Sequence, residues 1–247
     1  MVIELILIPI GFLVAIYGTL IGAGGGFLAV PTLLVLFGFP PQLAVGTSLV
    51  MVLFNAFSGG LAYAKQRKID YSVGIPFSLL TVPGAVLGAI LSTLFEARIF
   101  RILFAILLLL SSGFLIIRPA ARPTDGITQK MRMIYGYPIS FAVGFISSIF
   151  GIGGGIVHVP AMTYVLDMPI HTATATSHFI LIISAFVGVL SHAYLGHIEY
   201  LDAVLLSVGA VGGAQIGAYL SNRVRAPMIA RLLGLGLAIV GLRLLIL

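Results

Sequence analysis

The most constraining feature of this sequence is that one unit is used twice. Residues 18–92 align with residues 147–221 without a gap, and 25 of the 75 aligned pairs are identical. Each copy contains a run of glycines inside an apolar region, at Gly22–Gly26 and at Gly151–Gly155. Hydrophobic segments that are interrupted at corresponding positions of a repeat are the sequence feature that best indicates a substrate site in a membrane transporter.

The composition indicates a protein embedded in a lipid bilayer. Charged residues make up 8% of the chain, against roughly 25% in soluble domains. Residues 3–21 are read as a retained transmembrane segment, because neither a basic start nor an A-x-A cleavage site marks a signal peptide. The chain has no cysteine, which excludes disulfides and thiolate chemistry. We attribute the net charge of +6 to loops that orient the chain, so we expect no nucleic-acid partner.

Five apolar segments can be traced in each half of the chain. The only long polar stretch contains Pro119 and Pro123 and separates the halves. We therefore predict an all-α polytopic membrane protein with a first repeat at 1–117, a cytoplasmic linker at 118–133 and a second repeat at 134–247. The predicted segments are 3–21, 26–37, 42–64, 72–94 and 98–117 in the first repeat, and 134–150, 155–167, 172–195, 201–222 and 227–247 in the second.

Two of these segments, 26–37 and 155–167, are too short to cross a membrane unaided, because a helical span needs about 20 residues. Each is followed by proline, at Pro40 and at Pro169, and proline cannot continue a helix. The short segments could be half-helices, re-entrant hairpins or short tilted spans. We therefore expect glycine-rich broken or re-entrant helices in both repeats.

The distribution of basic residues predicts that the two repeats have opposite orientations in the membrane. The loop after the third segment carries Lys65, Arg67 and Lys68 in the first repeat, whereas the corresponding loop 196–199 has no lysine or arginine. The next loop reverses this pattern, because 223–231 carries three arginines and no acid. Basic loops face the cytoplasm, so we expect the linker inside, both termini outside, and an odd number of crossings, five, in each repeat.

The glycine runs predict the chemistry of the site. Glycine lets the backbone leave the helix and approach a ligand, and in a bilayer such backbone is tolerated only inside protein or along a cavity. A helix that begins after the break offers free amides and a dipole that favours an anion. The alternative is a pair of packing kinks. The glycines proposed to bind substrate are Gly22, Gly24, Gly25, Gly26, Gly151, Gly153, Gly154 and Gly155.

Two hydroxyl pairs follow the glycine runs at matching positions. Thr47 and Ser48 correspond to Thr176 and Ser177, early in the third segment of each repeat. Hydroxyls can donate hydrogen bonds to the oxygens of an oxyanion, and we predict that these four side chains bind substrate. The alternative is that they bond carbonyls of their own helix or cap it. Asn55, aligned with Ser184, is a weaker polar candidate.

All five histidines lie in the second repeat, and two of them are candidates for proton coupling. His178 directly follows the second hydroxyl pair, and His158 lies three residues after the glycine run. Histidine titrates near physiological pH and can accept a proton inside a membrane. No acid or cysteine accompanies the histidines at metal-site spacing, so we expect neither a metal nor a cofactor.

The acidic residues all fall at segment ends or in loops. This argues against a cation pathway, which usually needs carboxylates inside the membrane. The sequence contains no H-E-x-x-H motif and no P-loop, and no strand context exists for a dinucleotide fold. We therefore do not expect an enzyme.

The two stretches Gly18–Pro31 and Ser147–Pro160 resemble the duplicated signature of the sulfite exporter TauE/SafE family, as do the segments ending in Ser48 and Ser177. The resemblance covers nearly the whole chain. It implies a secondary transporter of the inner membrane that exports sulfite or a related small organosulfur anion by alternating access, with lipid as its surroundings. A passive anion channel, a transporter of another small carboxylate or oxyanion, and a homodimer remain open alternatives.

Overall fold

The computed structural model describes residues 4–117 and 128–246, and these residues form ten α-helices and one short 3-10 helix. Each predicted apolar segment corresponds to one α-helix, which confirms an all-α polytopic membrane protein. The helices are η1 (Glu4–Ile6), α1 (Leu7–Ile21), α2 (Gly26–Leu36), α3 (Pro41–Lys65), α4 (Tyr71–Ser92), α5 (Ala97–Ile117), α6 (Gln129–Phe150), α7 (Gly155–Tyr164), α8 (Ile170–Tyr194), α9 (Tyr200–Ser221) and α10 (Ala226–Ile246).

The start of α6 differs from its prediction. The helix begins at Gln129, before the predicted start at 134, because Thr128 caps it by accepting a hydrogen bond from the amide of Met131. The polar residues that follow Thr128 therefore form the first turn of the helix. Residues 118–127 of the predicted linker lie outside the described part of the chain.

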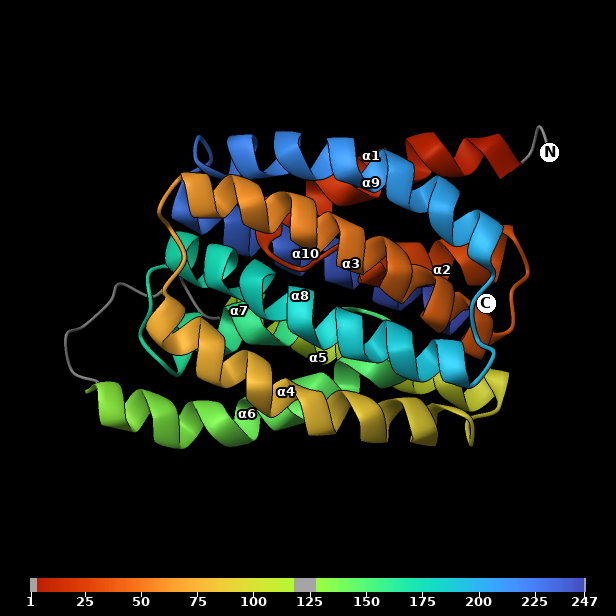
Figure 1. The fold of residues 1–247 in the computed structure, drawn as a ribbon, viewed down its shortest axis with the longest axis horizontal. Coiled ribbons are helices and arrows are strands. Elements are labelled where there is room, and N and C mark those ends of the chain that lie inside the picture. Colours follow the sequence, from red (N-terminus) through yellow and green to blue (C-terminus); the bar gives the residue numbers. More distant parts are fainter. Residues whose placement is uncertain (1–3, 118–127, 247) are drawn as a thin grey trace.

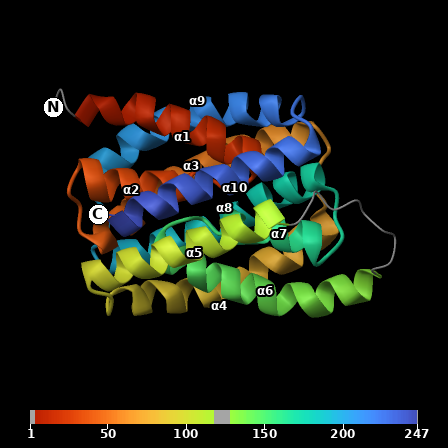
Figure 2. The ribbon, with the colours of Figure 1, turned by 180° about the vertical axis from the view of Figure 1, so that it is seen from behind.

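The short helices α2 and α7 belong to re-entrant hairpins. Helix α1 runs inward from the end of the molecule that holds the N-terminus, and α2 returns to that same end after the break at Gly22–Gly25 (Figures 1 and 2). Helices α6 and α7 form the matching hairpin from the opposite end. Each repeat thus has one hairpin and three helices that run from end to end, not five crossings. Three crossings are also an odd number, so the second repeat begins on the opposite side of the membrane and the predicted opposite orientation of the repeats is kept.

The two repeats are intertwined and do not form separate bundles. Helix α1 packs along α9 of the other repeat, and its counterpart α6 packs along α4. The equivalent helices α3 and α8 pack against each other in the middle, and α5 packs against α10. Small residues allow these contacts, since a Cβ at Gly84 would lie 2.2 Å from the carbonyl oxygen of Phe141, and one at Gly213 would lie 2.2 Å from that of Phe12.

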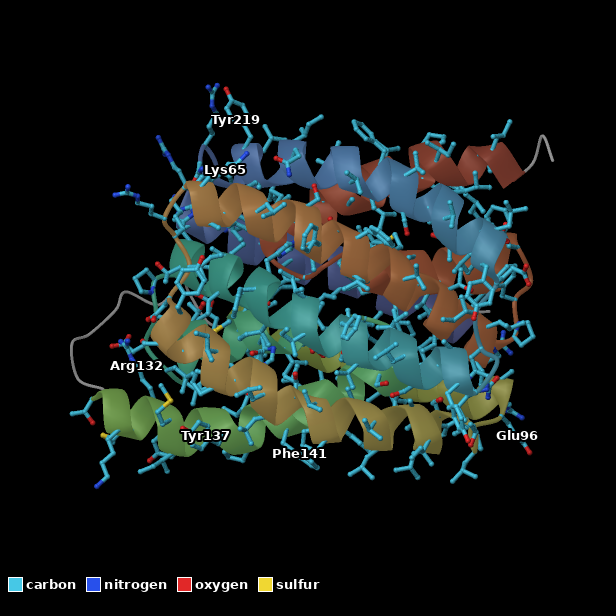
Figure 3. The ribbon with its side chains drawn as sticks, in the orientation of Figure 1. Lys65, Glu96, Arg132, Tyr137, Phe141 and Tyr219 are labelled. Atoms are coloured by element: carbon cyan, nitrogen blue, oxygen red, sulfur yellow. The ribbon has the colours of Figure 1, made fainter. Side chains whose placement is uncertain are left out.

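The end of α3 and the start of α6 carry basic residues at one end of the molecule. In Figure 3, Lys65, Arg132 and Tyr219 lie at one end, whereas Glu96 lies at the other. Both chain termini lie at the end that holds Glu96 (Figure 1). Among the described residues, seven helices are long and apolar enough to cross a membrane: the six that run from end to end and α6 of the second hairpin. The chain is therefore a multi-pass membrane protein.

We predict that the end holding Lys65 faces the cytoplasm. Reporter tags inserted after Lys68 and after Arg225 should report the cytoplasm, and a tag after His197 should report the outside, because basic loops are retained inside. Single cysteines introduced at the same three positions provide a second measurement, because the chain has no cysteine of its own. Their reaction with a membrane-impermeant thiol reagent is compared between right-side-out and inverted vesicles. Tags after Lys68 and His197 that report one common side would refute the inverted orientation.

Candidate functional site

The two glycine breaks meet at the centre of the molecule, backbone against backbone. A Cβ at Gly26 would lie 2.2 Å from the carbonyl oxygen of Gly151, and a Cβ at Gly155 would lie 2.2 Å from that of Gly22. The chain turns between the helices through left-handed conformations, with φ of +78° at Gly24 and +74° at Gly153. Glycine is needed at these positions both for the turn and for the close approach.

Two equivalent apolar side chains fill the space beside the breaks. Positions 24 and 153 face the same pair, because a Cβ at Gly24 would lie 3.1 Å from Leu181 and 3.3 Å from Val52, and one at Gly153 would lie 2.6 Å from Val52 and 2.9 Å from Leu181. Val52 and Leu181 correspond to each other in the repeat and are both fully buried. In this conformation they cover positions 24 and 153 of the two breaks from the side of α3 and α8.

Each break is followed by a helix whose first two amides have no backbone acceptor among the described residues. Leu28 and Ala29 donate to the carbonyl of Gly25, whereas within the described residues the amides of Gly26 and Phe27 have no backbone acceptor. The second repeat shows the same pattern at the start of α7. Free N-terminal amides and the helix dipole both favour an anion, by about 0.3–1 kcal/mol when exposed and up to about 2 kcal/mol when partly buried.

The predicted serines bridge the two repeats. Ser48 donates to the carbonyl oxygen of Gly151 at 3.0 Å, and Ser177 donates to that of Gly22 at 3.0 Å. Each serine therefore holds the glycine break of the other repeat, and neither bonds a carbonyl of its own helix. The same carbonyls that approach Gly26 and Gly155 are satisfied by these hydroxyls, which lowers the cost of burying them.

The predicted threonines hold loops at opposite ends of the molecule. Thr47 accepts a hydrogen bond from the amide of Glu199 at 3.0 Å, and Thr176 accepts one from the amide of Asp70 at 3.0 Å. Glu199 and Asp70 immediately precede α9 and α4, so each threonine fixes the start of a helix in the other repeat. After the predicted orientation, we call these two contacts the outer latch (Thr47–Glu199) and the inner latch (Thr176–Asp70).

His178 lies in a buried polar chain that leads to the first break. Its Nε2 is 3.2 Å from Thr19 Oγ1, Thr19 donates to Asn55 Oδ1 at 2.7 Å, and Asn55 donates to the carbonyl of Gly24 at 2.8 Å. Because the Thr19 proton goes to Asn55, Nε2 of His178 is the donor to Thr19. Nδ1 of His178 is then an acceptor, and it is buried with no partner among the described residues.

Tyr63 also belongs to this cluster, and His192 occupies the position equivalent to Tyr63 in the second repeat. Tyr63 donates to the carbonyl of Thr19 at 2.7 Å, and its ring lies edge-on against His178. His192 Nε2 likewise donates to the carbonyl of Ser148 at 2.9 Å, and its Nδ1 is 3.2 Å from Nδ1 of His197. Burial lowers the pKa of His197, which lies in the loop after α8.

The second histidine candidate lies apart from this cluster. His158 Nε2 is 3.4 Å from Ser140 Oγ, between α7 and α6, and its Nδ1 has no partner among the described residues. Sequence reasoning also missed Thr19, Tyr63 and Ser148. Thr19 and Ser148 correspond to each other in the repeat and both carry a hydroxyl, so this pair was a signal that could have been used. Tyr63 corresponds to His192, a chemically different residue, and the internal alignment gave no signal for it. Only its buried hydrogen bond identifies Tyr63.

The comparisons with known proteins agree with this architecture. A family model described as sulfite exporter TauE/SafE matches residues 7–244. This chain belongs to the sulfite exporter TauE/SafE family. It is 35% identical to the probable membrane transporter protein YunE of Bacillus subtilis (strain 168), over 97% of this chain and 96% of that protein. It is also 27% identical to a probable membrane transporter protein of Methanocaldococcus jannaschii, over 96% of this chain and 93% of that protein.

No solved structure matches the chain significantly. The family and the relatives nevertheless confirm the resemblance seen in the paired glycine motifs. Like other members of the sulfite exporter TauE/SafE family, the chain is a membrane transporter and not an enzyme.

We predict that the contact between the breaks cannot accept one methyl group. Gly26→Ala and Gly155→Ala should each lower the free energy of unfolding by about 1–3 kcal/mol or more, because the new Cβ overlaps a carbonyl oxygen. Thermal unfolding of the purified protein in detergent measures the loss. Gly113→Ala is the matched control, since that helical position has open space around it. Equal melting temperatures for all three variants would contradict the observed packing.

Proposed function

We propose that this protein exports sulfite or a related small organosulfur anion across the cytoplasmic membrane by alternating access, coupled to a proton. The observation that carries the proposal is the meeting of two inverted glycine breaks, each at the start of a helix, in a chain whose family is described as sulfite exporters. The substrate and the coupling rest on the arguments below.

An anion at the breaks is favoured by the backbone. The free amides at the starts of α2 and α7 point their dipoles toward the centre, and in transporters such helix starts face anionic groups of the substrate. The described basic side chains lie near helix ends and in loops, so the central charge is carried by backbone dipoles. Because Val52 and Leu181 cover Gly24 and Gly153 in this conformation, we infer that the separation of these two side chains opens room for the anion.

The two latches are the contacts that would open in turn during alternating access. The outer latch and the inner latch are equivalent contacts at opposite ends of the molecule, and both are formed in this conformation. We infer that transport opens one while the other holds. Because the two repeats differ in orientation, a rigid movement of one repeat against the other opens the two ends in turn.

His178 supplies the coupled proton in this proposal. It lies on α8 directly after the hydroxyl pair, and Thr19 and Asn55 connect it to the carbonyl of Gly24. A protonated histidine attracts an anion nearby, so the anion and the proton favour each other's binding. The free Nδ1 is the position that would take up this proton.

Transport by purified protein in liposomes tests the proposal. Vesicles loaded with sulfite should release it faster when protein is present, and an imposed pH gradient should change the concentration ratio reached at steady state. Sulfate, thiosulfate, sulfoacetate and acetate in the same assay define the substrate class. Release that merely follows the sulfite gradient, whatever the pH gradient, would indicate a passive channel. Selective release of acetate would overturn the sulfur-anion substrate.

We predict that His178→Gln flattens the pH dependence of transport. In the unaltered protein, transport should slow as the pH rises, because His178 loses the proton that attracts the anion; glutamine keeps a hydrogen-bond donor but cannot be protonated. His171→Gln is the matched control, because glutamine occupies the equivalent position 42 of the first repeat. Identical pH profiles for His178→Gln and the unaltered protein would show that His178 is structural.

A further inference from the structure

The two repeats build the same polar cluster, but only the first copy is filled. On α3, Asn55, Gly59 and Tyr63 are spaced four residues apart and share one helix face, which packs against Thr19. Asn55 uses both ends of its amide group, as an acceptor from Thr19 and as a donor to Gly24. This cluster is closed, because every polar atom of Asn55 that faces it has a protein partner.

In the second repeat the corresponding face of α8 carries smaller side chains. Ser184 replaces Asn55, His192 replaces Tyr63, and Ser148 replaces Thr19. Together these replacements remove more volume than the roughly 30 Å³ that one water molecule occupies in the liquid. Ser184 is too short to bridge to the second break as Asn55 bridges to the first. The carbonyl of Gly153 is the counterpart of the Gly24 carbonyl that Asn55 binds.

Two hydroxyls in this second cluster are left without a protein partner. Ser148 Oγ and Ser184 Oγ are both buried, with residue exposures of 1% and 2%, and neither has a hydrogen-bond partner in the described part of the chain. A buried polar group without a partner costs about 1–3 kcal/mol. Two such groups in one cluster therefore indicate a position for a ligand.

Both hydroxyls lie beside the same face of α8. A Cβ at Gly188 would lie 3.8 Å from Ser148 Oγ and 3.1 Å from the Leu49 side chain, and Ser184 is one helical turn before Gly188 on that face. The first copy is tighter at the same point, because a Cβ at Gly59 would lie 2.8 Å from the His178 ring and 2.9 Å from the Thr19 methyl group. The contacts are looser where the hydroxyls are free, and a ligand there requires the Leu49 side chain to shift.

We propose that the oxyanion group of the transported sulfur anion binds in the second repeat, between the hydroxyls of Ser148 and Ser184, and that Asn55 closes the equivalent position in the first. This inference rests on the proposed function and makes the binding site asymmetric. The two hydroxyls donate to oxyanion oxygens, and the carbonyl of Gly153 accepts the O–H of an anion that still carries one proton. A small sulfur oxyanion such as hydrogen sulfite offers both kinds of group.

The chemistry of the cluster favours such an anion over a cation. Two hydroxyl donors and the apolar Leu49 side chain lie beside this face of α8, and the cluster residues Ser148, Ser184, Gly188 and His192 include no carboxylate. The position lies beside the second glycine break, where the free amides at the start of α7 add to the favourable dipole. Water alone could also satisfy the hydroxyls, and the experiment is designed to separate these occupants.

Grafting the first repeat's side chains onto the second provides the test. In Ser148→Thr combined with Ser184→Asn, the added groups should bridge to each other and to Gly153, as Thr19 and Asn55 do at Gly24. We expect the melting temperature without ligand to stay equal or rise, and the affinity for sulfite to fall at least tenfold. Isothermal titration of the purified full-length protein with sulfite measures the affinity.

A smaller substitution keeps the test valid if the double variant does not fold. Ser184→Ala removes one hydroxyl without adding bulk and should weaken sulfite binding severalfold. Ser191→Ala is the matched control on the same helix, because its hydroxyl donates to the Val187 carbonyl of its own helix at 2.9 Å. Its affinity for sulfite should equal that of the unaltered protein.

The outcomes separate this inference from the proposed function. Unchanged sulfite affinity in the graft or in Ser184→Ala would mean that the hydroxyls face water only, and it would overturn the subsite while leaving sulfite export in place. An unaltered protein that binds none of sulfite, thiosulfate, sulfoacetate and sulfate would overturn both. Loss of affinity in the graft and in Ser184→Ala, with Ser191→Ala unaffected, would establish the second-repeat subsite.

Discussion

The fold depends on a direct contact between two stretches of exposed backbone. Helices α1 and α6 stop inside the molecule, so the carbonyls at their ends have no water to bond. Each of these carbonyls packs against the other repeat and accepts a hydrogen bond from it. The Gly151 carbonyl lies against Gly26 and accepts from Ser48. The Gly22 carbonyl lies against Gly155 and accepts from Ser177. Any side chain at positions 26 or 155 would push the two repeats apart.

This contact explains why the repeats are intertwined. Each hairpin must reach the centre from its own end, and its first helix then lies along the fourth helix of the other repeat, α1 on α9 and α6 on α4. The glycines of α4 and α9 bring these pairs close in lipid. A movement that separates the breaks must therefore shift whole helices, which links the centre of the molecule to the latches at Thr47 and Thr176.

The departures from symmetry are as informative as the repeat itself. His178 and Tyr63 fill the cluster beside the first break, whereas Leu49 and His192 occupy the equivalent positions of the second. One cluster contains a histidine with a free buried nitrogen, and the other contains two free buried hydroxyls. An evenly duplicated protein would place identical chemistry in both halves, and this protein separates the proposed proton site from the proposed oxyanion site.

The sequence by itself determined the duplication, the family, the membrane class and the bounds of nearly every helix, because hydropathy, glycine runs and prolines act locally along the chain. It also identified the glycines and hydroxyls that meet at the centre. Only the tertiary structure decided that α2 and α7 return as hairpins and that Ser48 and Ser177 hold the opposite break. It alone showed that Ser148 and Ser184 lack partners. These features depend on which segments pack together across the repeats, and no local pattern records that choice.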